Sequence, residues 1–122
     1  MKAFAFLNVA LGGALGSVLR FWLGGIVSDK VGAAFWGTLF VNIVGSFAIG
    51  VCAGMRAGDF TRNFVMIGVL GGFTTFSSFS LQTLELFQKG DTTLALTNVA
   101  LSIVLCLLGV WLGCFVGGQW KS

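Results

Sequence analysis

Ten residues near the middle of the chain, positions 71–80, read Gly-Gly-Phe-Thr-Thr-Phe-Ser-Ser-Phe-Ser and lie inside a long uncharged apolar run. Adjacent glycines and β-branched threonines weaken a helix. Backbone groups released into hydrocarbon cost several kcal/mol each unless they face a cavity, an ion or another protein segment. The stretch therefore predicts a transmembrane helix that is broken mid-membrane, with backbone and hydroxyl groups directed at a partner.

The composition places the whole chain in a lipid bilayer. Only 9% of the residues are charged and 57% are hydrophobic, whereas soluble domains carry about 25% charged residues. Four apolar runs are each long enough to cross the hydrocarbon core. We expect spans at residues 4–27, 33–55, 63–87 and 92–117, so that residues 1–122 form a single all-α domain of four transmembrane helices. The net charge of +3 forms no basic patch, so no nucleic-acid partner is expected.

Small residues recur at helical spacing in two of the expected spans. Gly12 and Gly16 lie one turn apart in the first span, and Gly109, Gly113 and Gly117 follow one another at the same spacing in the fourth. Small residues at this spacing let helix backbones approach closely in membranes. We expect both faces to form close contacts between helices.

Two strongly polar side chains lie within the first two spans. Arg20 is a charged residue in the second half of its span, which makes it a functional hypothesis by default. Its alternative role is to extend its charged end to the membrane interface. Asn42 lies between Val41 and Ile43 and must find hydrogen-bond partners. Lining a site and joining two helices are both consistent with its position.

The fourth span has a polar side. Four residues lie close to one side of the expected helix: Thr93, Asn98, Ser102 and Cys106. The cysteines Cys52, Cys106 and Cys114 lack the spacing of metal ligands. They are expected to act as small buried hydrophobes.

Charge counts give a weak topology signal. Four spans place both termini and the second loop on one side, with the cations Lys2, Arg56, Arg62 and Lys121. The other side carries Lys30 and Lys89, with Arg20 as a candidate third cation. So small a bias permits insertion in both orientations. Because four short spans scarcely enclose a lined pore by themselves, we expect a dimer, whose two copies could be antiparallel.

The side chains of the broken stretch fit two kinds of ion. Phe73, Phe76 and Phe79 recur every three residues, so they share one face wherever the helix is regular. Phenylalanine ring edges are positive and, beside amide and hydroxyl donors, attract a small anion without a fixed cation that would trap it. Core packing is the alternative role of these rings. Released carbonyls near residues 71–75 suit a hard cation such as sodium, and two breaks that meet at a dimer axis would double their number.

Three motifs resemble those of the CrcB/Fluc fluoride channels. Residues 71–80 resemble the signature of that family, residues 37–42 (Gly-Thr-Leu-Phe-Val-Asn) its second-helix motif, and residues 12–20 (Gly-Gly-Ala-Leu-Gly-Ser-Val-Leu-Arg) its first-helix motif. The resemblance covers all four spans. It implies an antiparallel, dual-topology homodimer with two pores in the bacterial inner membrane. Such a channel conducts fluoride passively, excludes chloride and lowers cytoplasmic fluoride.

The resemblance also implies roles for individual residues. Phe76 and Phe79 would line the fluoride path, and Asn42 would reach toward it. The carbonyl oxygens of Gly71 and Thr74 from both subunits would hold one sodium ion that is structural and not transported. The family's polar track would comprise Ser80, Ser102 and Cys106.

Some positions depart from the family pattern or have two implied roles. Gln82 stands where many members carry glutamate, Val110 replaces a hydroxyl residue, and Cys106 stands where serine is frequent. The polar track is therefore poorer at one end, but conduction is expected to survive because Asn42 and the phenylalanines are present. Arg20 would lie in the vestibule or anchor the first helix.

Other functional classes fit less well. A small four-span multidrug exporter needs a membrane-embedded carboxylate, yet the first two spans contain no Asp or Glu, and Glu85 lies near a helix end. A scaffold subunit does not explain the hydroxyl groups at mid-span. The chain has no histidine, the commonest general base, and no nucleophile beside a base. We therefore expect an ion channel and not an enzyme.

Overall fold

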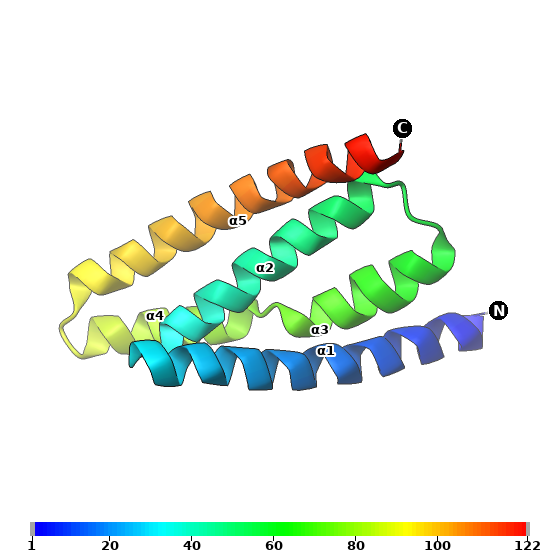
Figure 1. Ribbon diagram of the computed structural model, residues 1–122. Coiled ribbons are helices and arrows are strands. Elements are labelled where there is room, and N and C mark those ends of the chain that lie inside the picture. Colours follow the sequence, from blue (N-terminus) through cyan, green and yellow to red (C-terminus); the bar gives the residue numbers. More distant parts are fainter. Residues whose placement is uncertain (1, 122) are drawn as a thin grey trace.

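The computed structural model describes residues 2–121 and, among these, side chains up to Gln119. The described elements are all helical: α1 (Lys2–Val31), α2 (Ala34–Gly54), η1 (Thr61–Leu70), α3 (Gly71–Phe73), α4 (Phe76–Gln88) and α5 (Thr92–Lys121). The segment η1 is a wider, π-type helix, and at its end the Gly71 N–H contacts the Met66 carbonyl, five residues back. Figure 1 shows the long helices arranged as one bundle.

Four helical segments are long and apolar enough to cross a membrane, as the sequence predicts: Lys2–Val31, Ala34–Gly54, Thr61–Gln88 and Thr92–Gln119. The protein is therefore an all-helical, multi-pass membrane protein. The two chain ends lie at the same end of the bundle, together with the connection from α2 to η1, whereas the turns after α1 and α4 lie at the opposite end (Figure 1). An even number of passes gives this arrangement.

The first helix is longer than the predicted span of residues 4–27. It continues through Asp29 and Lys30, which the sequence assigns to a loop, and ends only at Val31. Gly32 then adopts a φ of +95°, and its N–H donates to the Ser28 carbonyl at 2.7 Å. This is a glycine stop for a helix, so α1 ends at a residue suited to the left-handed conformation.

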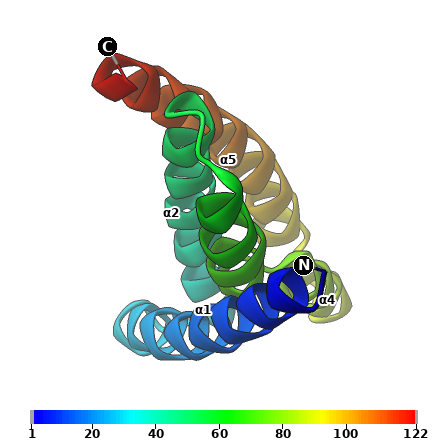
Figure 2. The same cartoon turned by 90° about the vertical axis from the view of Figure 1, so that its right-hand side faces the viewer.

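Both predicted glycine faces form close contacts. A Cβ at Gly12 or Gly16 would collide with backbone carbonyls of η1, and one at Gly113 or Gly117 would collide with carbonyls of α2. Gly109 makes an ordinary contact with α2, at 3.5 Å from the Ile43 carbonyl. Figures 1 and 2 both show α2 and α5 side by side. Since lipid gives helices no hydrophobic reason to associate, this close backbone packing holds the bundle together.

The helical ladder is interrupted between α3 and α4. Thr74 (φ −88°, ψ 158°) and Thr75 (φ −152°, ψ 121°) are extended. Both the glycine pair and the threonine pair are expected weak points, and of these Gly71 and Gly72 remain helical. Gly72 is small for another reason, because a Cβ there would lie only 2.7 Å from the Gly13 carbonyl of α1. The threonines make the interruption, since the Thr75 hydroxyl accepts a hydrogen bond from the Ser78 N–H at 3.2 Å and thereby caps α4.

Candidate functional site

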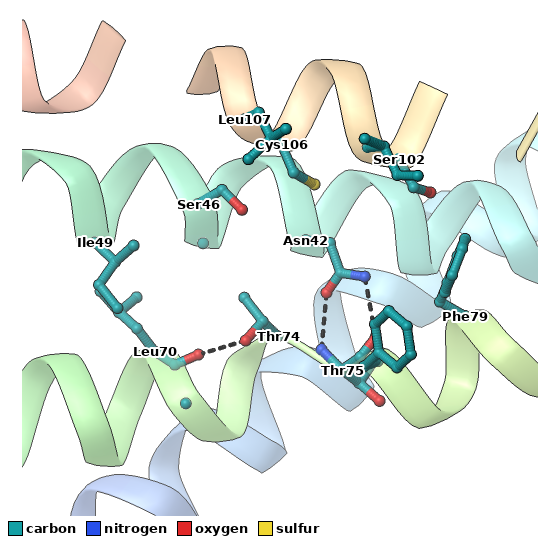
Figure 3. Close-up of a pocket in the computed structure, with 14 residues that line it drawn as sticks. Asn42, Ser46, Ile49, Leu70, Thr74, Thr75, Phe79, Ser102, Cys106 and Leu107 are labelled. Carbon is teal, nitrogen blue, oxygen red and sulfur yellow. Dashed lines mark hydrogen bonds between the residues drawn. The ribbon is translucent and has the colours of Figure 1, made fainter. Parts of the chain in front are cut away.

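A cavity of about 420 Å³ lies between α2, α4, α5 and the interruption (Figure 3). Most of the predicted site residues line it: Asn42, Gly71, Thr74, Phe76, Phe79, Ser102 and Cys106. They come from α2, from both sides of the interruption and from α5, so the fold brings together residues that are far apart in the sequence. Ser80 and Arg20 lie outside this cavity.

The Asn42 side chain pairs with the backbone of Thr75. Its Nδ2 donates to the Thr75 carbonyl at 3.0 Å, and the Thr75 N–H donates to its Oδ1 at 2.8 Å (Figure 3). One amide thus satisfies both backbone groups of an extended residue, which a carboxylate could not do because it lacks a donor. The contacts give Asn42 the helix-joining role. They leave one N–H and one lone pair of the amide free of Thr75, and its contact with an ion remains a prediction.

This pairing and the cap of α4 together release two carbonyl oxygens. In an uninterrupted helix the Thr75 N–H would bond to the Gly71 carbonyl and the Ser78 N–H to the Thr74 carbonyl. Here the Thr75 N–H donates to Asn42, and the Ser78 N–H donates to the Thr75 hydroxyl. The carbonyls of Gly71 and Thr74 therefore lose their usual partners, and both residues line the cavity. These are the two carbonyls that the resemblance assigns to a cation.

The phenylalanines divide into two groups. Phe76 and Phe79 are neighbours on α4, with ring centroids 5.3 Å apart and ring planes tilted by 50°, and both line the cavity. Phe73 precedes the interruption and is buried, with its ring close to Gly45 of α2. The shared face predicted from regular spacing holds for Phe76 and Phe79 only, because the two extended threonines change the direction of Phe73.

The predicted polar track is only partly assembled. Ser102 and Cys106 line the cavity from α5 (Figure 3). Ser80 is exposed, and its hydroxyl donates to the Phe76 carbonyl one turn earlier at 2.9 Å. A serine bonded to its own helix is a common local alternative to a tertiary contact. The track therefore comes from α5 in this structure, and a role for Ser80 toward an ion remains a prediction.

Arg20 lies at a second cavity of about 320 Å³, whose wall includes Thr38, Ser78 and Gln82. Its Nε donates to the Gly72 carbonyl at 3.0 Å, so it ties α1 to the segment just before the interruption. Among residues 2–121, the Gln82 Oε1 is a buried side-chain atom without a hydrogen-bond partner. The contact with Gly72 matches the anchoring role of Arg20, and its cavity is separate from the one that contains the rings.

Four apolar passes, three of which line a cavity that contains an amide, hydroxyl groups and two phenylalanine rings, define a class: multi-pass membrane proteins with a site between their helices. Residues 7–114 match the family described as CrcB-like protein, Camphor Resistance (CrcB), and the chain belongs to this family. The resemblance seen in the three motifs is thereby confirmed.

Curated relatives match the chain over most of its length. It is 54% identical over 117 residues to the fluoride-specific ion channel FluC of Rhodospirillum rubrum, covering 88% of this chain and 90% of the relative. It is 59% identical over 116 residues to the protein of the same name from Opitutus terrae, covering 88% of each. The relative from Thermus thermophilus is 50% identical over 119 residues, covering 93% of this chain and 94% of the relative. All three are named as ion channels, not as enzymes.

Replacing Asn42 by leucine should expose the backbone of the interruption. The variant Asn42→Leu keeps a side chain of similar size but removes both hydrogen bonds to Thr75. We expect amide hydrogen exchange across residues 74–79 to accelerate about tenfold or more, since leaving a buried polar group unpaired costs roughly 1–3 kcal/mol. Hydrogen–deuterium exchange with mass spectrometry on the purified protein measures this.

Ser46→Ala is the matched control, because Ser46 lines the same cavity one turn further along α2. Its removal should leave exchange over residues 74–79 unchanged. Equal exchange in wild type and Asn42→Leu would show that Asn42 does not hold the interruption.

Proposed function

We propose that the protein is a fluoride-selective ion channel of the bacterial inner membrane, through which fluoride leaves the cytoplasm passively. The observation that carries this proposal is the cavity in which two phenylalanine rings, an asparagine amide and a serine hydroxyl meet without a charged side chain. Relatives about half identical to the chain carry the name fluoride-specific ion channel. The family relationship and the chemistry of the cavity thus support the same function.

The cavity wall suits a small anion that must also leave. The rings of Phe76 and Phe79 offer weakly positive edges, and the second Asn42 N–H is a neutral donor. Many weak contacts compensate an anion for lost hydration, and the absence of a strong one lets it move on. Fluoride, the smallest halide, gains most from close donors, because the attraction between a charge and a donor grows as their separation falls.

A second copy of the chain would complete this cavity. Phe76 lines it and yet is 78% exposed in the single chain, so one chain leaves that ring without a cover. We propose a homodimer in which the interruptions of both chains meet midway through the bilayer. The weak charge bias between the two ends of the bundle supports an antiparallel, dual-topology arrangement.

The released carbonyls of Gly71 and Thr74 fit a sodium site at the junction of the two copies. Both oxygens belong to residues on the cavity wall whose usual backbone donors bond elsewhere. Hard cations prefer such neutral oxygens, and two copies would offer twice the number in one chain. The bound sodium would hold the two interruptions together; it is structural and is not transported.

Reconstituted protein should release fluoride and retain chloride. We expect vesicles loaded with both anions to lose only fluoride once a potassium ionophore removes the opposing voltage, as followed by ion-selective electrodes. Equal release of both anions would contradict the selectivity, and release of neither would contradict the channel itself.

Reconstitution at decreasing protein density tests the dimer, because the fraction of vesicles that release fluoride depends on how many chains form one working channel. A fraction best fitted by one chain per channel would contradict the dimer.

Changing Phe79 to isoleucine should slow fluoride release. The variant keeps an apolar side chain but removes the ring edge, and an aromatic contact worth about 0.5–1.5 kcal/mol corresponds to a rate roughly two to twelve times slower. Phe87→Ile is the control, because Phe87 lies near the other end of α4 and does not line the cavity. An unchanged rate in Phe79→Ile would assign this ring to packing only.

Removing sodium should weaken transport without changing selectivity. Protein purified and reconstituted with N-methylglucamine in place of sodium should release fluoride about tenfold more slowly, which corresponds to about 1.4 kcal/mol. Returning sodium should restore the rate, whereas the same concentration of potassium should not. Full activity in sodium-free protein would rule out the structural sodium and leave the fluoride channel intact.

A further inference from the structure

A buried chain of hydrogen bonds joins α5 to α4 on the side of the rings. Asn98 of α5 is only 2% exposed, and its Nδ2 donates to the Thr83 hydroxyl of α4 at 3.0 Å. The Thr83 hydroxyl in turn contacts the Phe79 carbonyl at 2.7 Å. At the other end, the Ser102 hydroxyl contacts the Asn98 Oδ1 at 3.5 Å.

The acceptor at the end of the chain fixes the direction of every bond. The Phe79 carbonyl can only accept, so the Thr83 hydroxyl must donate to it and use a lone pair for the Asn98 N–H. The Asn98 amide is then oriented with its oxygen toward Ser102, whose hydroxyl must donate. Asn98 fits this position because it supplies a donor to one helix and an acceptor to its own.

Both ends of this chain belong to the cavity. Phe79 and Ser102 line it, and Thr83 and Asn98 each lie one turn away from one of them. The N-terminal end of α4 is held by Asn42 of α2 through Thr75, so Asn98 of α5 provides a second attachment of the same helix. The surface of α4 is otherwise widely exposed, with Phe76 at 78% and Leu81 at 57%.

We propose that Asn98 is a positioning residue that holds the Phe79 ring at its place on the cavity wall by tying α4 to α5 through Thr83. This inference rests on the proposed function, because it assigns Asn98 a part in fluoride conduction. Asn98 does not line the cavity and needs no contact with the ion. It acts through the placement of the turn between Phe79 and Thr83.

The test removes either partner of the bond and compares fluoride release with the stability of α4. Asn98→Leu removes the amide, and Thr83→Val removes the hydroxyl while keeping the shape of the side chain. Each should slow fluoride release from proteoliposomes by about threefold to tenfold, the effect of one hydrogen bond between membrane helices. Each should also accelerate amide hydrogen exchange across Phe76–Gln88 in fluoride-free detergent solution.

Two further variants separate positioning from a general loss of packing. Thr83→Ser keeps the hydroxyl and should restore nearly the wild-type rate. The double variant Asn98→Leu/Thr83→Val should be no slower than the slower single variant, because both changes break the same bond. Thr97→Val is the matched control: Thr97 also donates to a carbonyl one turn earlier, that of Thr93 at 2.8 Å, but within α5. It should leave rate and exchange unchanged.

The outcomes separate this inference from the channel function. If the wild-type protein releases fluoride and both Asn98→Leu and Thr83→Val match its rate and its hydrogen exchange, the inference alone is overturned. Effects of the two changes that multiply in the double variant would also overturn it. A wild-type protein that releases no fluoride would overturn the proposed function and, with it, the conduction role of Asn98. Should Asn98→Leu fail to fold, the comparison of Thr83→Val with Thr83→Ser decides, since valine and serine differ from threonine by opposite changes.

Discussion

Two hydrogen bonds join the Asn42 amide to the Thr75 backbone. They offset the free-energy cost of interrupting the third apolar segment in an apolar environment. An extended residue in hydrocarbon would otherwise leave a donor and an acceptor without partners. Asn42 reaches Thr75 across 33 positions of sequence and satisfies both groups at 2.8 and 3.0 Å. Without such a partner, the chain would gain by continuing the helix from η1 through α4.

Once Thr75 is held, the remaining backbone groups follow. The Thr75 hydroxyl caps α4, the Gly72 carbonyl accepts from Arg20 of α1, and the Gly71 and Thr74 carbonyls are left beside the cavity. The two preceding helices therefore support the interruption from two directions, with a neutral amide from α2 and a guanidinium from α1. The Arg20 guanidinium lies at a separate cavity from the one that Phe76 and Phe79 line. Its charge therefore does not act as a strong anion trap beside the rings.

The sequence predicts the elements better than it predicts their partners. Four apolar runs, two glycine faces and the motif in residues 71–80 are local patterns, and the structure contains four long apolar helices and close contacts at both faces. The helical state of the glycine pair and the separation of Phe73 depend on tertiary contacts, whereas Ser80 forms a local bond within α4. Likewise, Arg20 bonds to a carbonyl 52 positions away. No periodicity in the sequence specifies such a pair, because many backbone carbonyls are equivalent until the helices are in place.

Asparagine, and not a larger apolar side chain, holds α4 at two points, because the rings on this helix need a fixed position. Apolar packing between helices in lipid has little direction, since a lipid tail can replace a leucine at small cost. An amide bonded at about 3 Å fixes both distance and orientation, and Asn42 of α2 and Asn98 of α5 do this for α4. Being neutral, the two amides hold α4 without adding net charge near Phe76 and Phe79.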